Sequence, residues 1–115
     1  MIRLINLKDH RIISDKCIIA ESYFSRLRGW IGKTRADVGE GIFFPRCSSI
    51  HMWCMSIPID VVFLNERNVV TSVRAGARPW KFLPITDLQA SGTLELPVGS
   101  IERLGILVGD ELCFG

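Results

Sequence analysis

The stretch that decides the fold is Ile57-Pro58-Ile59-Asp60-Val61-Val62-Phe63-Leu64. Apart from Asp60, every residue from Ile59 onward in this stretch is apolar, and such a run is typical of a strand that is buried on both faces. The turn-forming residues Glu66-Arg67-Asn68 follow it, and a second apolar run begins directly after them. The pattern therefore predicts a hairpin made of strands Ile59–Asn65 and Val69–Val73.

Similar short segments, rich in β-branched residues and punctuated by Gly, Pro, Asn or Asp, recur along the chain. The other expected strands are Ile2–Leu7, Lys16–Glu21, Gly41–Phe44, Ser48–Met52, Gly92–Leu96 and Glu111–Phe114. Helical spacing of apolar residues appears only in two short stretches, from Ser22 to about Gly32 and from about Val98 to Leu104. The longest expected loop is Arg74–Asp87. Many short strands with two short helices predict a mainly β fold, either a compact β-sandwich of jelly-roll-like character or a partly closed barrel.

Length and composition limit the classes of protein that the chain can belong to. Its 115 residues suit a single domain over residues 1–115, and 48% hydrophobic with 23% charged residues is an ordinary globular composition. No stretch reaches the roughly 18 apolar residues of a membrane helix, so no membrane partner is expected. The net charge of +2 makes a nucleic-acid partner unlikely. Four cysteines without a CxxC pair predict reduced thiols and a cytoplasmic location.

Two carboxylates stand in otherwise apolar strands, Asp60 in the central stretch and Glu95 in Leu94-Glu95-Leu96-Pro97. A buried carboxylate needs hydrogen bonds or a cation, or it takes up a proton. Asp60 and Glu95 are therefore the candidate catalytic residues, as an acid/base pair or as ligands of a hard divalent cation. The structural alternative is that they anchor arginines such as Arg28 or Arg46 within the fold.

The segment that begins at Cys47 concentrates other reactive side chains. It offers thiol, imidazole and thioether groups for a soft metal ion, and Cys47 with His51 for nucleophilic catalysis. In an extended strand, however, Cys47 and His51 are about 13 Å apart, and Cys54 points to the opposite face. No phosphate-binding glycine motif occurs either. The sequence thus predicts no metal site and no cofactor, and packing or a half-exposed sheet edge is the alternative for these residues.

Aromatic and basic residues provide candidate binding groups. Trp80 lies in the predicted long loop between Arg78 and Lys81, and such a loop could cover a pocket or contact a partner. Further basic residues surround Trp30, although solvated or ion-paired side chains explain these groups equally well. The candidate binding residues are Arg28, His51, Trp53, Asp60, Trp80 and Glu95.

Four pieces of the chain together resemble one known family. They are Arg28-Gly29-Trp30-Ile31-Gly32-Lys33, Gly41-Ile42-Phe43-Phe44-Pro45, the stretch from His51 to Leu64, and Leu94-Glu95-Leu96-Pro97-Val98-Gly99 with Gly109-Asp110. In this order and combination they are similar to the motifs of the DUF192 family, also called uncharacterised ACR. The resemblance covers about residues 24–114. Many members differ at Met52-Trp53-Cys54-Met55, which leaves the role of that aromatic position open.

The resemblance implies a compact, mostly β domain of jelly-roll-like or barrel character, and it implies no established activity. Asp60 and Glu95 match positions of the family motifs. We therefore expect a small ligand- or protein-binding β-domain without catalysis, whose partner is an unknown small molecule or protein. The alternatives are a hydrolase-like enzyme that uses Asp60 and Glu95, with or without a divalent cation, and a purely structural accessory subunit.

Overall fold

The computed structural model describes residues 2–20, 37–50, 57–78 and 84–115. Within these ranges it contains nine strands and one short helix. The strands are β1 (Ile2–Asn6), β2 (Ile12–Ile19), β3 (Glu40–Pro45), β4 (Ser49–Ile50), β5 (Ile59–Leu64), β6 (Val70–Ala77), β7 (Ile85–Thr86), β8 (Gly92–Pro97) and β9 (Leu112–Phe114), and the helix is α2 (Ser100–Leu104). The predicted mainly β class is confirmed.

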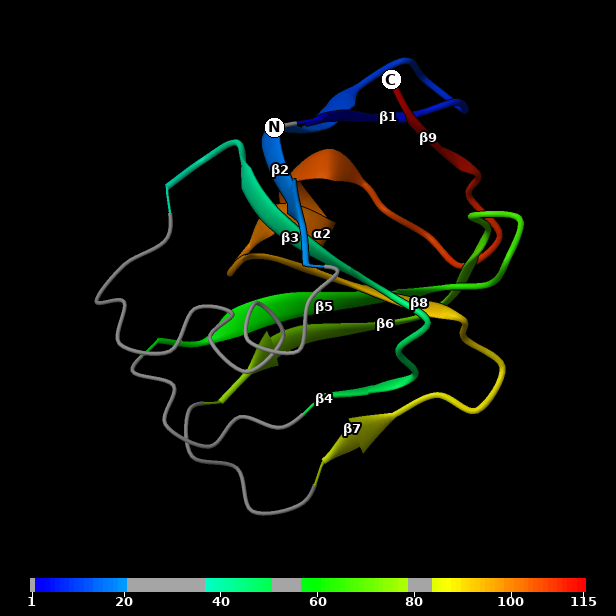
Figure 1. Cartoon of the computed structure of the whole chain (residues 1–115). Helices are drawn as coiled ribbons and strands as arrows, with labels where there is room; N and C mark the ends of the chain where they lie inside the picture. The colour runs from blue at the N-terminus through cyan, green and yellow to red at the C-terminus, as the bar shows by residue number, and fades with distance from the viewer. Residues whose placement is uncertain (1, 21–36, 51–56, 79–83) are drawn as a thin grey trace.

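Seven of the strands form one curled sheet in the order β6-β5-β8-β3-β2-β1-β9 (Figure 1). All neighbours in it run antiparallel except β2 and β3. The remaining strands, β4 and β7, pair with each other as a two-stranded ribbon beside β5 and β6 (Figure 1). We call this pair the β4–β7 ribbon.

The curl brings the two edges of the large sheet together. An isolated bridge joins Val69, next to the β6 edge, to Glu111, next to the β9 edge. Two backbone hydrogen bonds flank it, from the Val70 nitrogen to the Asp110 oxygen (2.8 Å) and from the Leu112 nitrogen to the Asn68 oxygen (2.9 Å). The large sheet is therefore a partly closed barrel, one of the two architectures that the sequence predicts.

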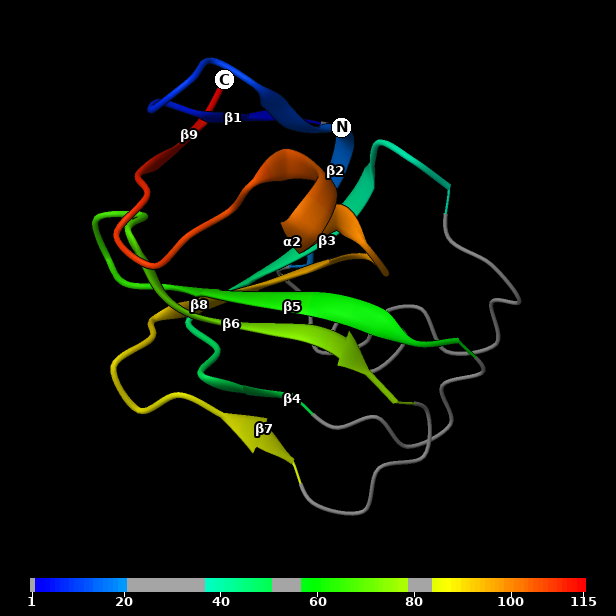
Figure 2. The same ribbon diagram turned by 180° about the vertical axis from the view of Figure 1, so that it is seen from behind.

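Two apolar clusters lie on the two faces of this sheet. The helix-side cluster fills the inside of the curl, where α2 packs between β1–β9 and β5–β8 (Figure 2). Its members are Leu4, Ile13, Cys17, Val62, Leu64, Val70, Leu94, Leu96, Ile101, Leu104, Ile106 and Leu112. The ribbon-side cluster lies on the other face and includes side chains of the β4–β7 ribbon. Its members are Ala20, Ile42, Phe44, Ile50, Ile57, Ile59, Val61, Phe63, Ala77 and Ile85.

Strand β5 connects the two clusters because its side chains alternate between the faces. Val61 and Phe63 join the ribbon-side cluster, whereas Val62 and Leu64 join the helix-side cluster. All six residues of the strand are buried. Each fully buried aliphatic or aromatic side chain stabilises the fold by about 1.5–3 kcal/mol. The central stretch therefore contributes to both halves of the core at once, as its apolar run, interrupted only by Asp60, predicts.

The predicted hairpin after β5 is confirmed. Asn65 Oδ1 accepts hydrogen bonds from the backbone nitrogens of Arg67 (2.9 Å) and Val69 (3.1 Å). Asn68 adopts a left-handed conformation with φ of 61°, which asparagine tolerates better than most residues. The side chain of Asn65 thus provides an acceptor for two backbone N–H groups of the turn, and the left-handed conformation of Asn68 lets the chain reverse.

Two expectations for local structure need correction. The predicted loop Arg74–Asp87 is wrong at both ends, because β6 extends to Ala77 and β7 occupies Ile85–Thr86. Two residues are too few to show a periodic pattern, so β7 could not be predicted from the sequence. Strand β2 starts at Ile12 rather than Lys16 and contains register shifts against β1 that break its alternation.

The two predicted helices have different outcomes. The second is confirmed and shortened to Ser100–Leu104, and glycines at its two ends, Gly99 (φ 90°) and Gly105 (φ 63°), adopt left-handed conformations. The first, from Ser22 to about Gly32, falls on residues outside the described part. In the described ranges no helix is long and apolar enough to cross a membrane.

Candidate functional site

Asp60 is fully buried on β5 and its carboxylate is held by backbone amides. The Gly76 nitrogen donates a hydrogen bond to Oδ1 (2.9 Å) and the Ile101 nitrogen donates one to Oδ2 (2.8 Å). The Gly76 amide is available because β6 has an extra residue opposite Asp60: Ile59 pairs with Ala77, but Val61 pairs with Arg74. Backbone groups, rather than an arginine, therefore anchor this carboxylate.

Glu95 lies on the neighbouring strand β8, but its side chain points to the other face. In the register of β5 and β8, Asp60 pairs with Leu96 and Val61 pairs with Glu95. Leu96 belongs to the helix-side cluster and Val61 to the ribbon-side cluster. Since directly paired residues share a face, Asp60 and Glu95 are on opposite sides of the sheet. The structure does not bring together the two carboxylates that the sequence suggests as an acid/base or cation-binding pair.

The cross-strand neighbours of Glu95 are apolar. Its pairing partners on the two adjacent strands are Ile42 of β3 and Val61 of β5, both in the ribbon-side cluster. The residue is only 6% exposed, and its Oε1 atom has no hydrogen-bond partner among the described residues. Burial raises the pKa of the Glu95 carboxyl from 4.5 to about 8. At neutral pH the group is therefore mainly a neutral carboxylic acid, able to donate and to accept a hydrogen bond.

Four of the six predicted binding residues, Arg28, His51, Trp53 and Trp80, lie outside the described part of the chain. Described residues near three of them in the sequence belong to the ribbon-side cluster. These are Ile50 just before His51, Ile57 shortly after Trp53, and Ala77 shortly before Trp80. Glu95 is thus the predicted site residue whose position on the ribbon-side face is established.

No metal site emerges from the described residues. In the four described ranges, no three His, Cys, Asp or Glu side chains gather closely enough to hold an ion. The soft-metal and cysteine-nucleophile alternatives need His51 or Cys54, which are outside these ranges. Cys47 is a free, partly buried thiol whose Sγ donates to the Ser49 oxygen (3.1 Å).

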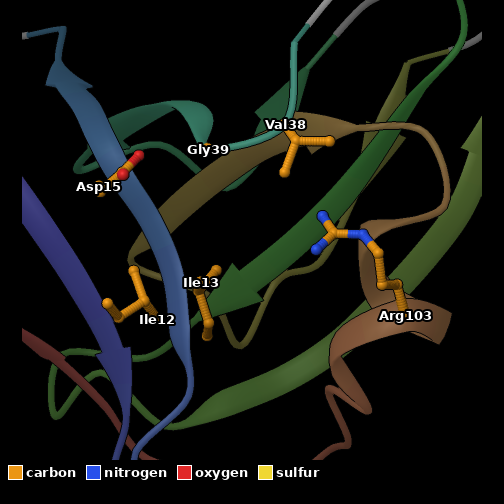
Figure 3. A pocket seen from close by; sticks show the side chains of 6 residues that line it. All are labelled: Ile12, Ile13, Asp15, Val38, Gly39 and Arg103. Carbon is orange, nitrogen blue, oxygen red and sulfur yellow. The ribbon is translucent and has the colours of Figure 1, made fainter.

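A pocket that the sequence does not predict lies on a different part of the molecule (Figure 3). It has a volume of about 220 Å³ and lies between β2, the chain just before β3, and α2. Its lining residues are Ile12, Ile13, Asp15, Val38, Gly39 and Arg103. Nothing in the sequence connects these three distant segments, because only the sheet order and the packing of α2 bring them together.

Comparison with known proteins identifies the family. The sequence model of DUF192, described as Uncharacterized ACR, matches residues 5–114. The chain belongs to the DUF192 family. A DUF192 relative, named UPF0127 protein, occurs in Thermococcus sibiricus; it is 32% identical over 113 residues, which are 95% of this chain and 72% of the relative. The family and this relative have no characterised function in these descriptions.

Two crystal structures share the fold of this DUF192 chain. One is a Sinorhizobium meliloti protein provisionally described as a transcription regulator, with a TM-score of 0.84 and 24% identity over 98% of this chain and 91% of that one. The other is a protein of unknown function from Novosphingobium aromaticivorans, with a TM-score of 0.83 and 22% identity over 97% of this chain and 82% of that one. At these identities the likeness shows the fold alone.

Proposed function

We propose that this chain is a small-molecule-binding domain without catalytic activity, and that its ligand forms a hydrogen bond with the Glu95 carboxyl on the ribbon-side face. The observation that carries the proposal is the buried Oε1 atom of Glu95, which has no hydrogen-bond partner among the described residues. A buried polar group without a partner destabilises a protein by about 1–3 kcal/mol. A ligand that supplies the partner recovers this free energy as binding affinity.

The chemistry around Glu95 indicates the kind of ligand. Ile42 and Val61 flank the carboxyl, so the ligand has an apolar body. A neutral carboxyl donates one hydrogen bond and accepts another, which complements the N–H and C=O groups of an amide. Because Glu95 is nearly buried, the ligand reaches it only when apolar side chains of this face move aside. An uncharged, mainly apolar molecule with one amide group fits these requirements.

Among the described residues, no second acid or base lies beside Glu95, which favours binding over hydrolysis as the proposal. Asp60 lies on the opposite face, and both its oxygens already accept backbone hydrogen bonds. In the described ranges, the neighbours of Glu95 on β3 and β5 are aliphatic. The arrangement resembles a recognition group in an apolar site more than a two-carboxylate hydrolase, whose acids must converge on one substrate.

The test is a ligand screen by NMR on the ¹⁵N-labelled chain, using a library of small apolar amides. The expected result is that at least one amide shifts the backbone signals of Ile42, Val61 and Glu95. Glu95→Leu removes the hydrogen-bonding group but keeps an apolar side chain of similar size. It should abolish binding and raise the melting temperature, because an unsatisfied buried polar group disappears.

A matched control separates binding from general effects of losing an acid. Glu102 is an exposed residue of α2, so Glu102→Gln should leave both ligand affinity and melting temperature unchanged. The proposal fails if no amide in the library perturbs the three signals. It also fails if Glu95→Leu binds the ligand as tightly as the unmodified chain does.

A further inference from the structure

The pocket between β2 and α2 is a second concave surface, and it is independent of Glu95. Its walls come from Ile12, Ile13 and Asp15 of β2, from Val38 and Gly39, and from Arg103 of α2 (Figure 3). The volume of about 220 Å³ is below the range of about 300–1,000 Å³ that drug-sized ligands occupy. A ligand of amino-acid size is therefore the largest that the pocket encloses.

One part of the pocket wall is aliphatic and open to water. Ile12 is 48% exposed and Val38 is 70% exposed, whereas Ile13 beside them is buried in the helix-side cluster. Covering exposed aliphatic surface releases about 25 cal/mol per Å². An apolar group of a ligand that rests on Ile12 and Val38 would gain this stabilisation.

The pocket also carries two opposite charges that are not neutralised within the described structure. Asp15 and Arg103 both line it, and neither side chain forms an ion pair or a hydrogen bond with another described residue. Figure 3 shows the guanidinium of Arg103 reaching from α2 toward Ile13 and Val38, with Asp15 on the far side of the pocket. The two charges are thus unpaired and available to a ligand that carries both an anionic and a cationic group.

The glycine opposite Asp15 leaves room for its carboxylate. Gly39 has a φ of 92°, and a Cβ atom placed on it would lie 2.5 Å from Asp15 Oδ1. Any other residue at this position would displace the carboxylate. The Gly39 carbonyl oxygen accepts hydrogen bonds from Ser14 Oγ (2.7 Å) and from the Lys16 nitrogen (3.1 Å), which hold the turn against β2.

The position of Arg103 depends on the buried Asp60. Asp60 Oδ2 accepts the hydrogen bond of the Ile101 nitrogen in the first turn of α2, two residues before Arg103. Arg11 Nη1 also approaches the Arg103 carbonyl oxygen at 3.4 Å. The backbones of both walls of the pocket are therefore held in place before a ligand arrives, which reduces the entropy that binding must overcome.

We infer that this pocket binds a free α-amino acid with an aliphatic side chain. The ligand carboxylate pairs with the Arg103 guanidinium, whose planar donors match a carboxylate. The ligand ammonium group pairs with the Asp15 carboxylate, and the aliphatic side chain covers Ile12 and Val38. The pocket has one group for each part of such a molecule, and this inference stands whether or not Glu95 binds a ligand.

The experiment compares four probes by NMR titration of the ¹⁵N-labelled chain. L-valine carries all three features; isovalerate lacks the ammonium group, isobutylamine lacks the carboxylate, and glycine lacks the aliphatic side chain. We expect L-valine to shift the backbone signals of Ile13, Gly39 and Arg103. Since a charge-assisted hydrogen bond contributes about tenfold or more in affinity, isovalerate and isobutylamine should bind at least about tenfold more weakly. Glycine should also bind more weakly.

Two exposed side chains allow the charges to be removed without disturbing the core. Arg103→Gln and Asp15→Asn should each weaken L-valine binding by about tenfold or more, while Arg67→Gln, in the distant hairpin turn, should not change it. The inference is overturned if L-valine leaves the signals of Ile13, Gly39 and Arg103 unchanged at its solubility limit. Equal affinity for isovalerate and L-valine, or unaltered binding in either pocket variant, overturns it as well.

Discussion

Asp60 of β5 and Ile101 of α2 are 41 positions apart in the sequence, and Asp60 Oδ2 accepts a 2.8 Å hydrogen bond from the Ile101 nitrogen. This bond joins the central strand of the sheet to the first turn of the helix. The other oxygen, Oδ1, joins the same strand to Gly76 of β6. One buried carboxylate thus connects three elements of the fold.

Asp60→Asn should lower stability by about 1–3 kcal/mol. The asparagine side chain keeps one acceptor oxygen, but its NH₂ group must face a backbone N–H that then has no acceptor. The measurement is the midpoint of urea-induced unfolding, with Glu66→Gln in the exposed hairpin as the matched control. An Asp60→Asn midpoint equal to that of the control would contradict the role given to the two hydrogen bonds.

Gly76→Ala should destabilise the fold by about 1–2 kcal/mol because Gly76 has a φ of 65°. An added Cβ atom would meet no other atom within 4 Å, so the cost arises from the backbone conformation and not from a steric clash. Gly115→Ala is the control, since that residue also has open space but no positive φ. Equal thermal unfolding of the two variants would show that the bulge of β6 tolerates a side chain.

The Glu95 carboxyl should make the protein less stable as the pH rises from about 4.5 to about 8. Its pKa is 4.5 when unfolded and about 8 when folded, so over this interval folding requires uptake of a proton. The stability that the neutral Glu95 carboxyl contributes is fully present below pH 4.5. It is lost as the pH rises through the folded-state pKa of about 8. With about 1.4 kcal/mol for each unit of pKa difference, the loss is on the order of a few kcal/mol.

Glu95→Gln removes this titration while keeping the shape and the hydrogen-bonding capacity of the neutral acid. Its free energy of unfolding, measured in urea at several pH values, should vary less between pH 5 and 8 than that of the unmodified chain. Glu66→Gln should retain the full slope. Parallel pH profiles for the Glu95→Gln variant and the unmodified chain would mean that Glu95 is ionised in the folded state.

Asp87 should make the protein less stable as the pH falls in the acid range, whereas Glu95 makes it less stable as the pH rises. Hydrogen bonds from the Ser72 hydroxyl (2.6 Å) and the Thr71 hydroxyl (2.7 Å) lower the pKa of its carboxyl below 3.8. The stability that Asp87 contributes is present above pH 3.8 and is lost as the pH falls through the lowered value. In Asp87→Asn, unfolding in urea should depend less on pH in this range, whereas the exposed Glu111→Gln should behave like the unmodified chain.

The sequence was informative wherever a residue's environment follows from its immediate neighbours. The apolar residues on both sides of Asp60 in β5 predicted a strand buried on both faces, and they also predicted the burial of Asp60. Glu66-Arg67-Asn68 predicted the hairpin because turn residues act locally. β7 and the end of β6 escaped prediction because a two-residue strand and a bulge with a glycine have no periodicity.

The sequence by itself determined that this chain is mainly β, that it resembles the DUF192 family, and that Asp60 and Glu95 are enclosed by apolar strands. Short β-branched segments and apolar runs carry the information on the fold and on the two acids, and the four motifs carry the resemblance, without long-range contacts. Only the tertiary structure decided that the two acids face opposite sides of the sheet, because this depends on the register between β5 and β8. The same holds for the pocket of Asp15 and Arg103, which exists because sheet order and helix packing place distant segments side by side.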